Sequence, residues 1–315
     1  MSRIICTGAG GFICNHLIKY LKTKNPNDYI LGIDIKYPEW EKTVADEFIL
    51  QDLRQSCPEL FKDIDEVFHL AANMGGISYI ENNKADIVWD NTMINMQMLK
   101  QCQKAQVKKF LFTSSACVYP GYLQNNAEVV PLKEEDAYPA DAEDGYGWEK
   151  LMMERTCRHF MEDYGLQTYV ARFHNIYGSL GTYEGGREKS PAALCRKVAL
   201  ADDTLEIWGD GSQTRSYCHI NDCVEGLWRL MQSDYHQPLN IGSDRLVSVN
   251  QLADIIMEVA GKKLVKVYDL DKPQGVKGRN ADVSKVWEVL GWSPIVSLEL
   301  GLKETYQWIS AQISP

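Results

Sequence analysis

The segment "RIICTGAGGFICNHL" (residues 3–17) decides the fold class of this chain. A short apolar run is followed by Gly8, Gly10 and Gly11, and a helical pattern begins directly after them. Glycines at a strand-to-helix turn allow a tight bend and let backbone N–H groups approach a phosphate at the helix N-terminus. Cys14 stands where a third small residue, usually glycine or alanine, follows such a turn. The segment therefore predicts a phosphate-binding turn between a strand and a helix.

Apolar runs and helical patterns alternate through the first 173 residues. Runs with little polar alternation are typical of parallel strands buried on both faces. They lie at 3–8, 28–35, 66–71, 108–114 and 167–173, with a shorter candidate at 47–50. Helical patterns separate them at 12–24, 84–105 and 147–164. The alternation predicts an α/β fold with a Rossmann-type, doubly wound parallel sheet.

The pattern loosens after residue 173 and predicts a second, smaller α/β domain. Residues 1–173 are expected to form the cofactor-binding domain and 174–315 mainly the substrate-binding domain. A segment of about 217–242, with a helix and the strand "PLNIGS", is expected to return to the first domain. No long linker separates the two parts, so we expect them to pack together.

Composition excludes several classes of function. The net charge of −10 and the pI near 5.2 predict no binding to nucleic acid or to anionic membranes. No apolar run approaches the ~18 residues of a membrane span. Nine cysteines without a CxxC pair indicate reduced thiols in a cytoplasmic protein, and six histidines show no metal-binding spacing.

Asp34 ends the second predicted strand. An acid at that place in a strand–turn–helix–strand unit binds the ribose hydroxyls of NAD and repels the additional phosphate of NADP. The sequence therefore predicts NAD as the cofactor.

Tyr146 and Lys150 are four residues apart at the start of a predicted helix, which places them on one face. A neighbouring ammonium is expected to lower the pKa of the phenol. The pair could then accept a hydroxyl proton while a hydride leaves for the nicotinamide. Ser114 and Ser115, at the end of the preceding strand, complete this hypothesis.

With these motifs, the chain resembles the extended short-chain dehydrogenase/reductase family. The segments "TGAGGFI", "HLAA", "TSSACVYP", "YGWEK", "NIYG" and "NIGS" follow the family's order over nearly the whole chain. The resemblance implies a nucleotide-sugar enzyme with a Ser115, Tyr146 and Lys150 triad, and a homodimer formed through helices 84–105 and 147–164. It implies NAD contacts from Gly8, Gly11, Phe12, Ile13, Asp34, Asp52, Leu53, Ala71, Ala72, Tyr146 and Lys150.

Within the family, "AANMGG" (71–76), "SSACVYP" (114–120) and "GGREKSPAALCRK" (185–197) resemble the branch that epimerises GDP-mannose at C3 and C5. Asn73 departs from that branch, which has an acid there. The resemblance implies that C4 is transiently oxidised, after which Cys117 and Lys189 act as acid and base at the neighbouring carbons. We expect the following helix N-terminus and Arg187 to lower the pKa of Lys189, and the lysine to favour the Cys117 thiolate.

The same resemblance implies a GDP-sugar substrate, GDP-mannose in the first place. It nominates as substrate-binding residues Gly75, Ser115, Cys117, Asn175, Glu188, Lys189, Lys197, Gln213, Arg215 and Arg279. Three alternatives stay open. They are an enzyme that epimerises and reduces GDP-4-keto sugars with NADPH, as GDP-fucose synthases do, a 4-epimerase of another nucleotide sugar, and a noncatalytic NAD-sensing relative.

Overall fold

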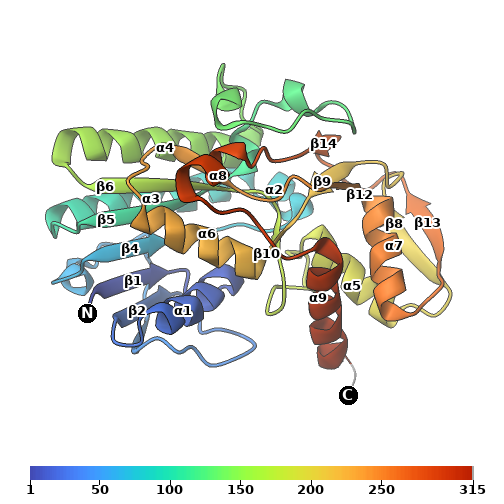
Figure 1. Ribbon diagram of the computed structural model, residues 1–315, viewed down its shortest axis with the longest axis horizontal. Helices are drawn as coiled ribbons and strands as arrows, with labels where there is room; N and C mark the ends of the chain where they lie inside the picture. Colours follow the sequence, from blue (N-terminus) through green and yellow to red (C-terminus); the bar gives the residue numbers. More distant parts are fainter. Residues whose placement is uncertain (314–315) are drawn as a thin grey trace.

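A seven-stranded parallel sheet forms the centre of one end of the molecule (Figure 1). Six of its strands come from residues 1–173 and one, β11, comes from residues 238–241. The structure is a computed structural model that describes residues 1–313. The strand order is β11-β6-β5-β4-β1-β2-β3, and every neighbouring pair is parallel. The strands are β1 (Arg3–Thr7), β2 (Tyr29–Asp34), β3 (Glu47–Leu50), β4 (Glu66–His69), β5 (Lys109–Ser115), β6 (Gln167–Phe173) and β11 (Pro238–Ile241).

Helices cover both faces of this sheet. Successive strand residues point to opposite faces, so neighbouring residues pack against different helices. Ile4 packs on the face covered by α1 (Phe12–Lys24), α6 (Ile220–Gln232) and α8 (Ser284–Leu290). Ile5 packs on the face covered by α3 (Lys84–Lys104) and α4 (Asp144–Tyr164). The predicted doubly wound parallel sheet is confirmed.

The strand order reverses between β1 and β4, which leaves a crevice at their carboxyl ends. Several short elements lie between the main strands and helices of this part. They are α2 (Ile77–Asn82) and the 3₁₀ helices η1 (Pro58–Phe61), η2 (Ala116–Val118), η3 (Gly121–Gln124) and η4 (Glu134–Ala137). Among them, η2 follows β5 at the same edge of the sheet as the crevice.

Three helices, α5 (Ser190–Leu200), α7 (Val249–Ala260) and α9 (Leu298–Ile313), pack together at the other end of the molecule (Figure 1). Short strands flank them in three small sheets. The strands are β7 (Ile176–Tyr177) with β10 (Cys218–His219), β8 (Thr204–Trp208) with β13 (Val265–Asp269), and β12 (Leu246–Ser248), β9 (Thr214–Ser216) and β14 (Gly278–Arg279) in that order. No helix within residues 1–313 is long and apolar enough to cross a membrane.

Candidate active site

The glycine-rich turn joins β1 to α1 at the crevice. Gly8 has a φ of +73°, and a Cβ there would lie 2.9 Å from the backbone N of Ala71, so only glycine fits. No side chain caps α1 at Gly11, which leaves the N–H groups of the first helical turn available. This turn can hold a phosphate.

Asp34 lies at the carboxyl end of β2, directly beside the turn. Its carboxylate accepts hydrogen bonds from the backbone N–H groups of Gly10 at 2.9 Å and Ile35 at 2.6 Å. A pocket beside it is lined by Gly10, Gly11, Phe12, Lys36 and Trp40, among others. A phosphate cradle with an acid at the end of the next strand fits a dinucleotide.

The other residues nominated for the cofactor lie in α1, after β4 and after β3. Ile13 lies in the first turn of α1, and Ala71 and Ala72 follow β4. Asp52 follows β3 and forms a bidentate pair with Arg54, which lowers the pKa of its carboxyl group. Leu53 is buried in the core.

Tyr146 and Lys150 lie in the first two turns of α4, and both are buried. The Lys150 Nζ lies 5.7 Å from the centre of the Tyr146 ring and 3.9 Å from a carboxylate oxygen of Glu149. Burial raises the pKa of the Tyr146 phenol, Cys117 and Glu149 raise it further, and Ser115 opposes them. The lowered phenol pKa expected from the lysine is therefore not found: burial dominates, and the group that lowers the pKa is Ser115.

Cys117 lies in η2, directly after β5, and is partly accessible while the other eight cysteines are buried. Its backbone N–H donates to Ser115 Oγ at 3.2 Å, and Arg279 Nη1 lies 3.6 Å from its sulfur. Burial raises the pKa of the thiol, as does the nearby Glu143 carboxylate, while Arg279 opposes them. The environment as a whole therefore favours the neutral thiol, although the charge interaction with Lys189 acts toward the thiolate as expected.

Lys189 immediately precedes α5. Burial lowers the pKa of its ammonium, and the positive charge of Arg279 lowers it further. Arg187, the expected cause, instead donates to the Tyr79 hydroxyl at 2.6 Å. The charge of the Cys117 thiolate favours the charged form of Lys189, so the two side chains lie within electrostatic reach of each other. The thiol and the amine are therefore biased in opposite directions, one toward holding a proton and the other toward releasing one.

Two arginines meet on neighbouring strands, since Arg215 of β9 pairs in register with Arg279 of β14. Burial, together with the charge of Arg279, lowers the pKa of Arg215 to about 10. Two cations held this close favour an anion between or beside them. The guanidinium of Arg279 also pairs with Glu143 at 2.5 Å and donates to Gln124 at 2.6 Å.

The remaining nominated substrate residues have three kinds of environment. Asn175 donates to the Ser216 carbonyl at 2.8 Å, and Gly75 is buried against the Tyr79 ring. Glu188 Oε2 and Gln213 Oε1 are buried and have no hydrogen-bond partner within residues 1–313, so each could accept a ligand hydroxyl. Lys197 instead forms an ion pair with Glu206 at 2.5 Å, 5.4 Å from the Trp208 ring centre.

Sequence reasoning did not identify Glu143, Gln124 or Glu149 as part of the site. Glu143 stands three residues before Tyr146, and Glu149 precedes Lys150, so their position beside the Tyr-x-x-x-Lys motif was the available signal. Gln124 offered no comparable pattern. In residues 1–313, no group of three or more His, Cys, Asp or Glu side chains is arranged to hold a metal ion.

Comparison with known proteins places this geometry in a family. Residues 4–242 match the NAD dependent epimerase/dehydratase family. The chain is 45% identical to GDP-mannose 3,5-epimerase of Arabidopsis thaliana, covering 99% of this chain and 83% of that protein. It is 30% identical to UDP-glucuronic acid decarboxylase 6 of the same plant, covering 95% and 86%.

Solved structures agree with the family match. UDP-glucose 4-epimerase from Thermotoga maritima superposes with a TM-score of 0.87 at 26% identity, covering 99% of this chain and 100% of that one. UDP-glucuronic acid 4-epimerase from Bacillus cereus, in complex with UDP-glucuronic acid and NAD, has a TM-score of 0.84 at 27% identity, covering 98% and 99%. The resemblance inferred from the motifs is confirmed, and the chain belongs to the NAD dependent epimerase/dehydratase family.

Proposed function

We propose that this enzyme converts GDP-mannose by epimerisation at C3 and C5, with NAD as a recycled cofactor. The observation that carries the proposal is the pair formed by Cys117 and Lys189, a thiol biased toward its neutral form and an ammonium biased toward losing its proton. Both lie with Tyr146 and Arg279 in one site. The 45% identity to GDP-mannose 3,5-epimerase over 99% of the chain supports the substrate.

The first step creates acidity in the sugar. Tyr146, next to Ser115 and Lys150, would take the proton of the C4 hydroxyl as a phenolate. Burial favours the phenol, so this step needs positive charge from Lys150 and from the bound cofactor to favour the phenolate. The glycine-rich turn and Asp34 would hold NAD, which would supply a reversible hydride acceptor for C4. A carbonyl at C4 makes the hydrogens on C3 and C5 acidic, which they are not in the parent sugar.

The proton transfers at C3 and C5 then fall to Cys117 and Lys189. A lysine whose ammonium is destabilised by burial can accept a carbon-bound proton, and a protonated thiol can supply one. No net oxidant or reductant is consumed, because the hydride that leaves C4 returns to it. Arg215 and Arg279, which pair in register on neighbouring strands, would bind the diphosphate, and the buried oxygens of Glu188 and Gln213 would accept sugar or ribose hydroxyls.

Incubation with GDP-mannose in deuterated water, without added reductant, tests the proposal. NMR should find deuterium at C3 and C5 of the sugar. Replacing Cys117→Ala or Lys189→Ala should slow the incorporation by about 10²–10⁴-fold, the usual effect of losing a general acid or base. Cys102→Ala, which removes a buried thiol of α3 from the core, is the matched control. Turnover only with NADPH would favour the reductase alternative, and inversion at C4 without exchange would favour a 4-epimerase.

We also propose that the enzyme is a homodimer of the cytoplasm. Trp89 and Met96 of α3, with Trp148 and Met152 of α4, are large apolar side chains exposed on two helices that pack side by side. Burying them against a second copy would remove this apolar surface from water. The nine free thiols suit a reducing compartment. Sedimentation equilibrium at twice the 35.8 kDa chain mass tests the dimer.

A further inference from the structure

The loop that delivers Lys189 begins with a pair of glycines. Gly185 and Gly186 have φ values of +85° and +82°, and an added Cβ at either would contact nothing within 4 Å. Two adjacent, unpacked glycines give the chain little conformational restraint of its own. The position of Lys189, three residues further on, therefore depends on contacts made by the residues between.

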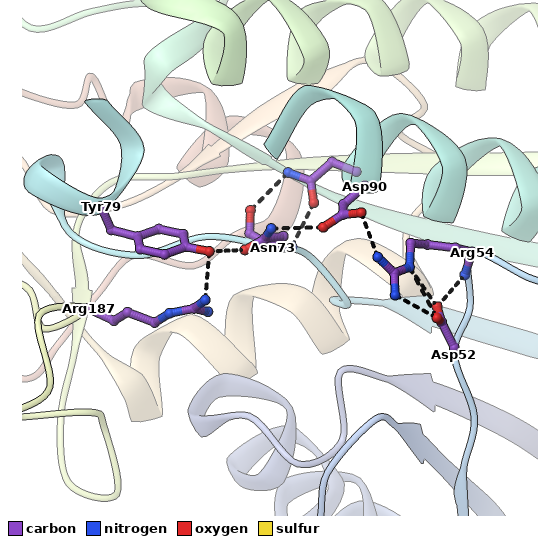
Figure 2. A network of polar contacts seen from close by, with 7 residues as sticks. Asp52, Arg54, Asn73, Tyr79, Asp90 and Arg187 are labelled. Atoms are coloured by element: carbon purple, nitrogen blue, oxygen red, sulfur yellow. Dashed lines mark hydrogen bonds and ion pairs between the residues drawn. The ribbon is translucent and has the colours of Figure 1, made fainter. Parts of the chain in front are cut away.

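Those contacts come from Gly76 and Tyr79, at the start of α2. The Gly76 N–H donates to the Arg187 carbonyl at 3.0 Å, and a Cβ at Gly76 would lie 2.4 Å from the Glu188 carbonyl oxygen. The Arg187 guanidinium lies 4.0 Å from the centre of the Tyr79 ring, and its Nη2 donates to the Tyr79 hydroxyl at 2.6 Å (Figure 2). Tyr79 thus contacts the Arg187 guanidinium through both the face of its ring and its hydroxyl.

The Tyr79 hydroxyl is itself fixed. It donates to Asn73 Oδ1 at 2.9 Å, while Asn73 Nδ2 donates to Asp90 Oδ2 at 2.9 Å (Figure 2). Asp90 in turn accepts from Arg54 at 2.8 Å. The amide at position 73 accepts on one side and donates on the other, whereas an ionised acid there would face the Asp90 carboxylate at that distance. This pairing accounts for asparagine at position 73.

We propose that Asn73, Tyr79 and Arg187 are positioning residues that hold the 185–189 loop so that Lys189 meets the sugar. We refer to these three residues as the Tyr79 clamp. The inference rests on the proposed function, because it assigns the clamp to the proton transfers at C3 and C5. The Tyr79 clamp is not expected to affect the hydride transfer at C4, because that step uses residues of α4 and β5. Small displacements of a reacting group cost large factors in rate, so the loop needs such a restraint.

Tyr79→Phe tests the clamp, since it keeps the ring beneath Arg187 and removes the hydroxyl. Deuterium incorporation from solvent should fall about tenfold, the effect of one charge-assisted hydrogen bond. The nicotinamide absorbance change in the first turnover and the KM for GDP-mannose should stay within about twofold of wild type. Tyr268→Phe, which removes an exposed tyrosine hydroxyl that contacts Asn250, is the control.

An exchange of the acid and the amide adds a rescue experiment. Asn73→Asp should slow exchange as Tyr79→Phe does, because two carboxylates would face each other. The double variant Asn73→Asp with Asp90→Asn should recover most of the rate. In that variant the new amide at position 90 would donate to the new carboxylate at position 73 and still accept from Arg54. Absence of rescue would show that the amide at 73 does not act through this hydrogen-bond chain, and would overturn the proposal.

Limited trypsin digestion without substrate separates the clamp from the chemistry. Arg187 is exposed, so cleavage after it reports how firmly the loop is held. Faster cleavage in Tyr79→Phe than in Tyr268→Phe, together with slowed exchange, supports the proposal. Unchanged cleavage and unchanged exchange overturn it. If wild type shows no exchange, the proposed function falls and the clamp's catalytic role falls with it, whereas faster cleavage would still show that the clamp restrains the loop.

Discussion

Replacing Glu154→Gln would leave a buried guanidinium without its counter-charge. Arg172 of β6 forms a bidentate pair with Glu154 of α4, through Nε to Oε1 at 2.9 Å and Nη2 to Oε2 at 2.7 Å. Both side chains are no more than 3% exposed. Ser114, next to the catalytic candidate Ser115, donates to the same carboxylate at 2.5 Å. The pair therefore fixes α4 against the ends of β5 and β6, where the site is built.

The magnitude follows from burial and geometry. Removing one partner of a buried ion pair costs about 3–5 kcal/mol, because the other charge is left uncompensated. Glutamine can still accept one hydrogen bond from Arg172, so we expect the lower end, about 3 kcal/mol. For a chain of 315 residues this corresponds to a decrease in Tm of roughly 5 °C.

Differential scanning calorimetry of the two proteins measures this shift. Glu162→Gln is the matched control, since Glu162 lies on the same helix and pairs with Arg158 at 2.7 Å, but both side chains are exposed. Its Tm should stay within about 1 °C of wild type. If Glu154→Gln also shifts the Tm by less than about 1 °C, the buried pair does not contribute as argued, and the account of how α4 is fixed is wrong.

Two further predictions concern protonation. Glu143→Gln removes a carboxylate that raises the Cys117 pKa. The pH midpoint of Cys117 alkylation by iodoacetamide, followed by peptide mass spectrometry, should therefore move downward. An equal or higher midpoint would refute the assignment. Burial lowers the pKa of both His69 and His174 to about 3, below the ~6.5 of the unfolded chain. The contribution of these two histidines to the free energy of unfolding is complete above about pH 6.5. Below that pH it decreases by roughly 1.4 kcal/mol per pH unit for each histidine, down to about pH 3. Urea unfolding between pH 7 and 5 measures this decrease, and a stability that does not change over that range would contradict the prediction.

The central sheet could be predicted because its strands are buried on both faces. Segments such as "KKFLFTS" form continuous apolar runs, and β5 lies there at Lys109–Ser115. The small sheets of the second part carry no such signal. The strand β13 (Val265–Asp269) is largely exposed, and β14 consists of two residues held by β9. Such strands are defined by their partners rather than by their own residues.

The start of α4 could not be predicted because a tertiary contact determines which residues stand there. The pattern predicts a helix from residue 147, but α4 begins at Asp144. Gly145 and Gly147 lower the helix propensity of the first turn. A Cβ at Gly147 would lie 2.2 Å from the carbonyl oxygen of Cys117, so glycine is required there by the turn that carries the thiol. The residue that obscures the helix is the one that brings the helix and the thiol together.

The chemistry of the site could be predicted only in part, for a related reason. Tyr146 and Lys150 could be paired from sequence because helical spacing alone puts them on one face. The pairing of Glu143 with Arg279 joins residues 136 positions apart and depends on where β14 packs. That pairing sets the charge beside Cys117, and burial of the phenol, the thiol and the ammonium decides the direction of each pKa shift. A motif identifies which groups can exchange protons, whereas the tertiary fold determines which of them holds the proton before the sugar arrives.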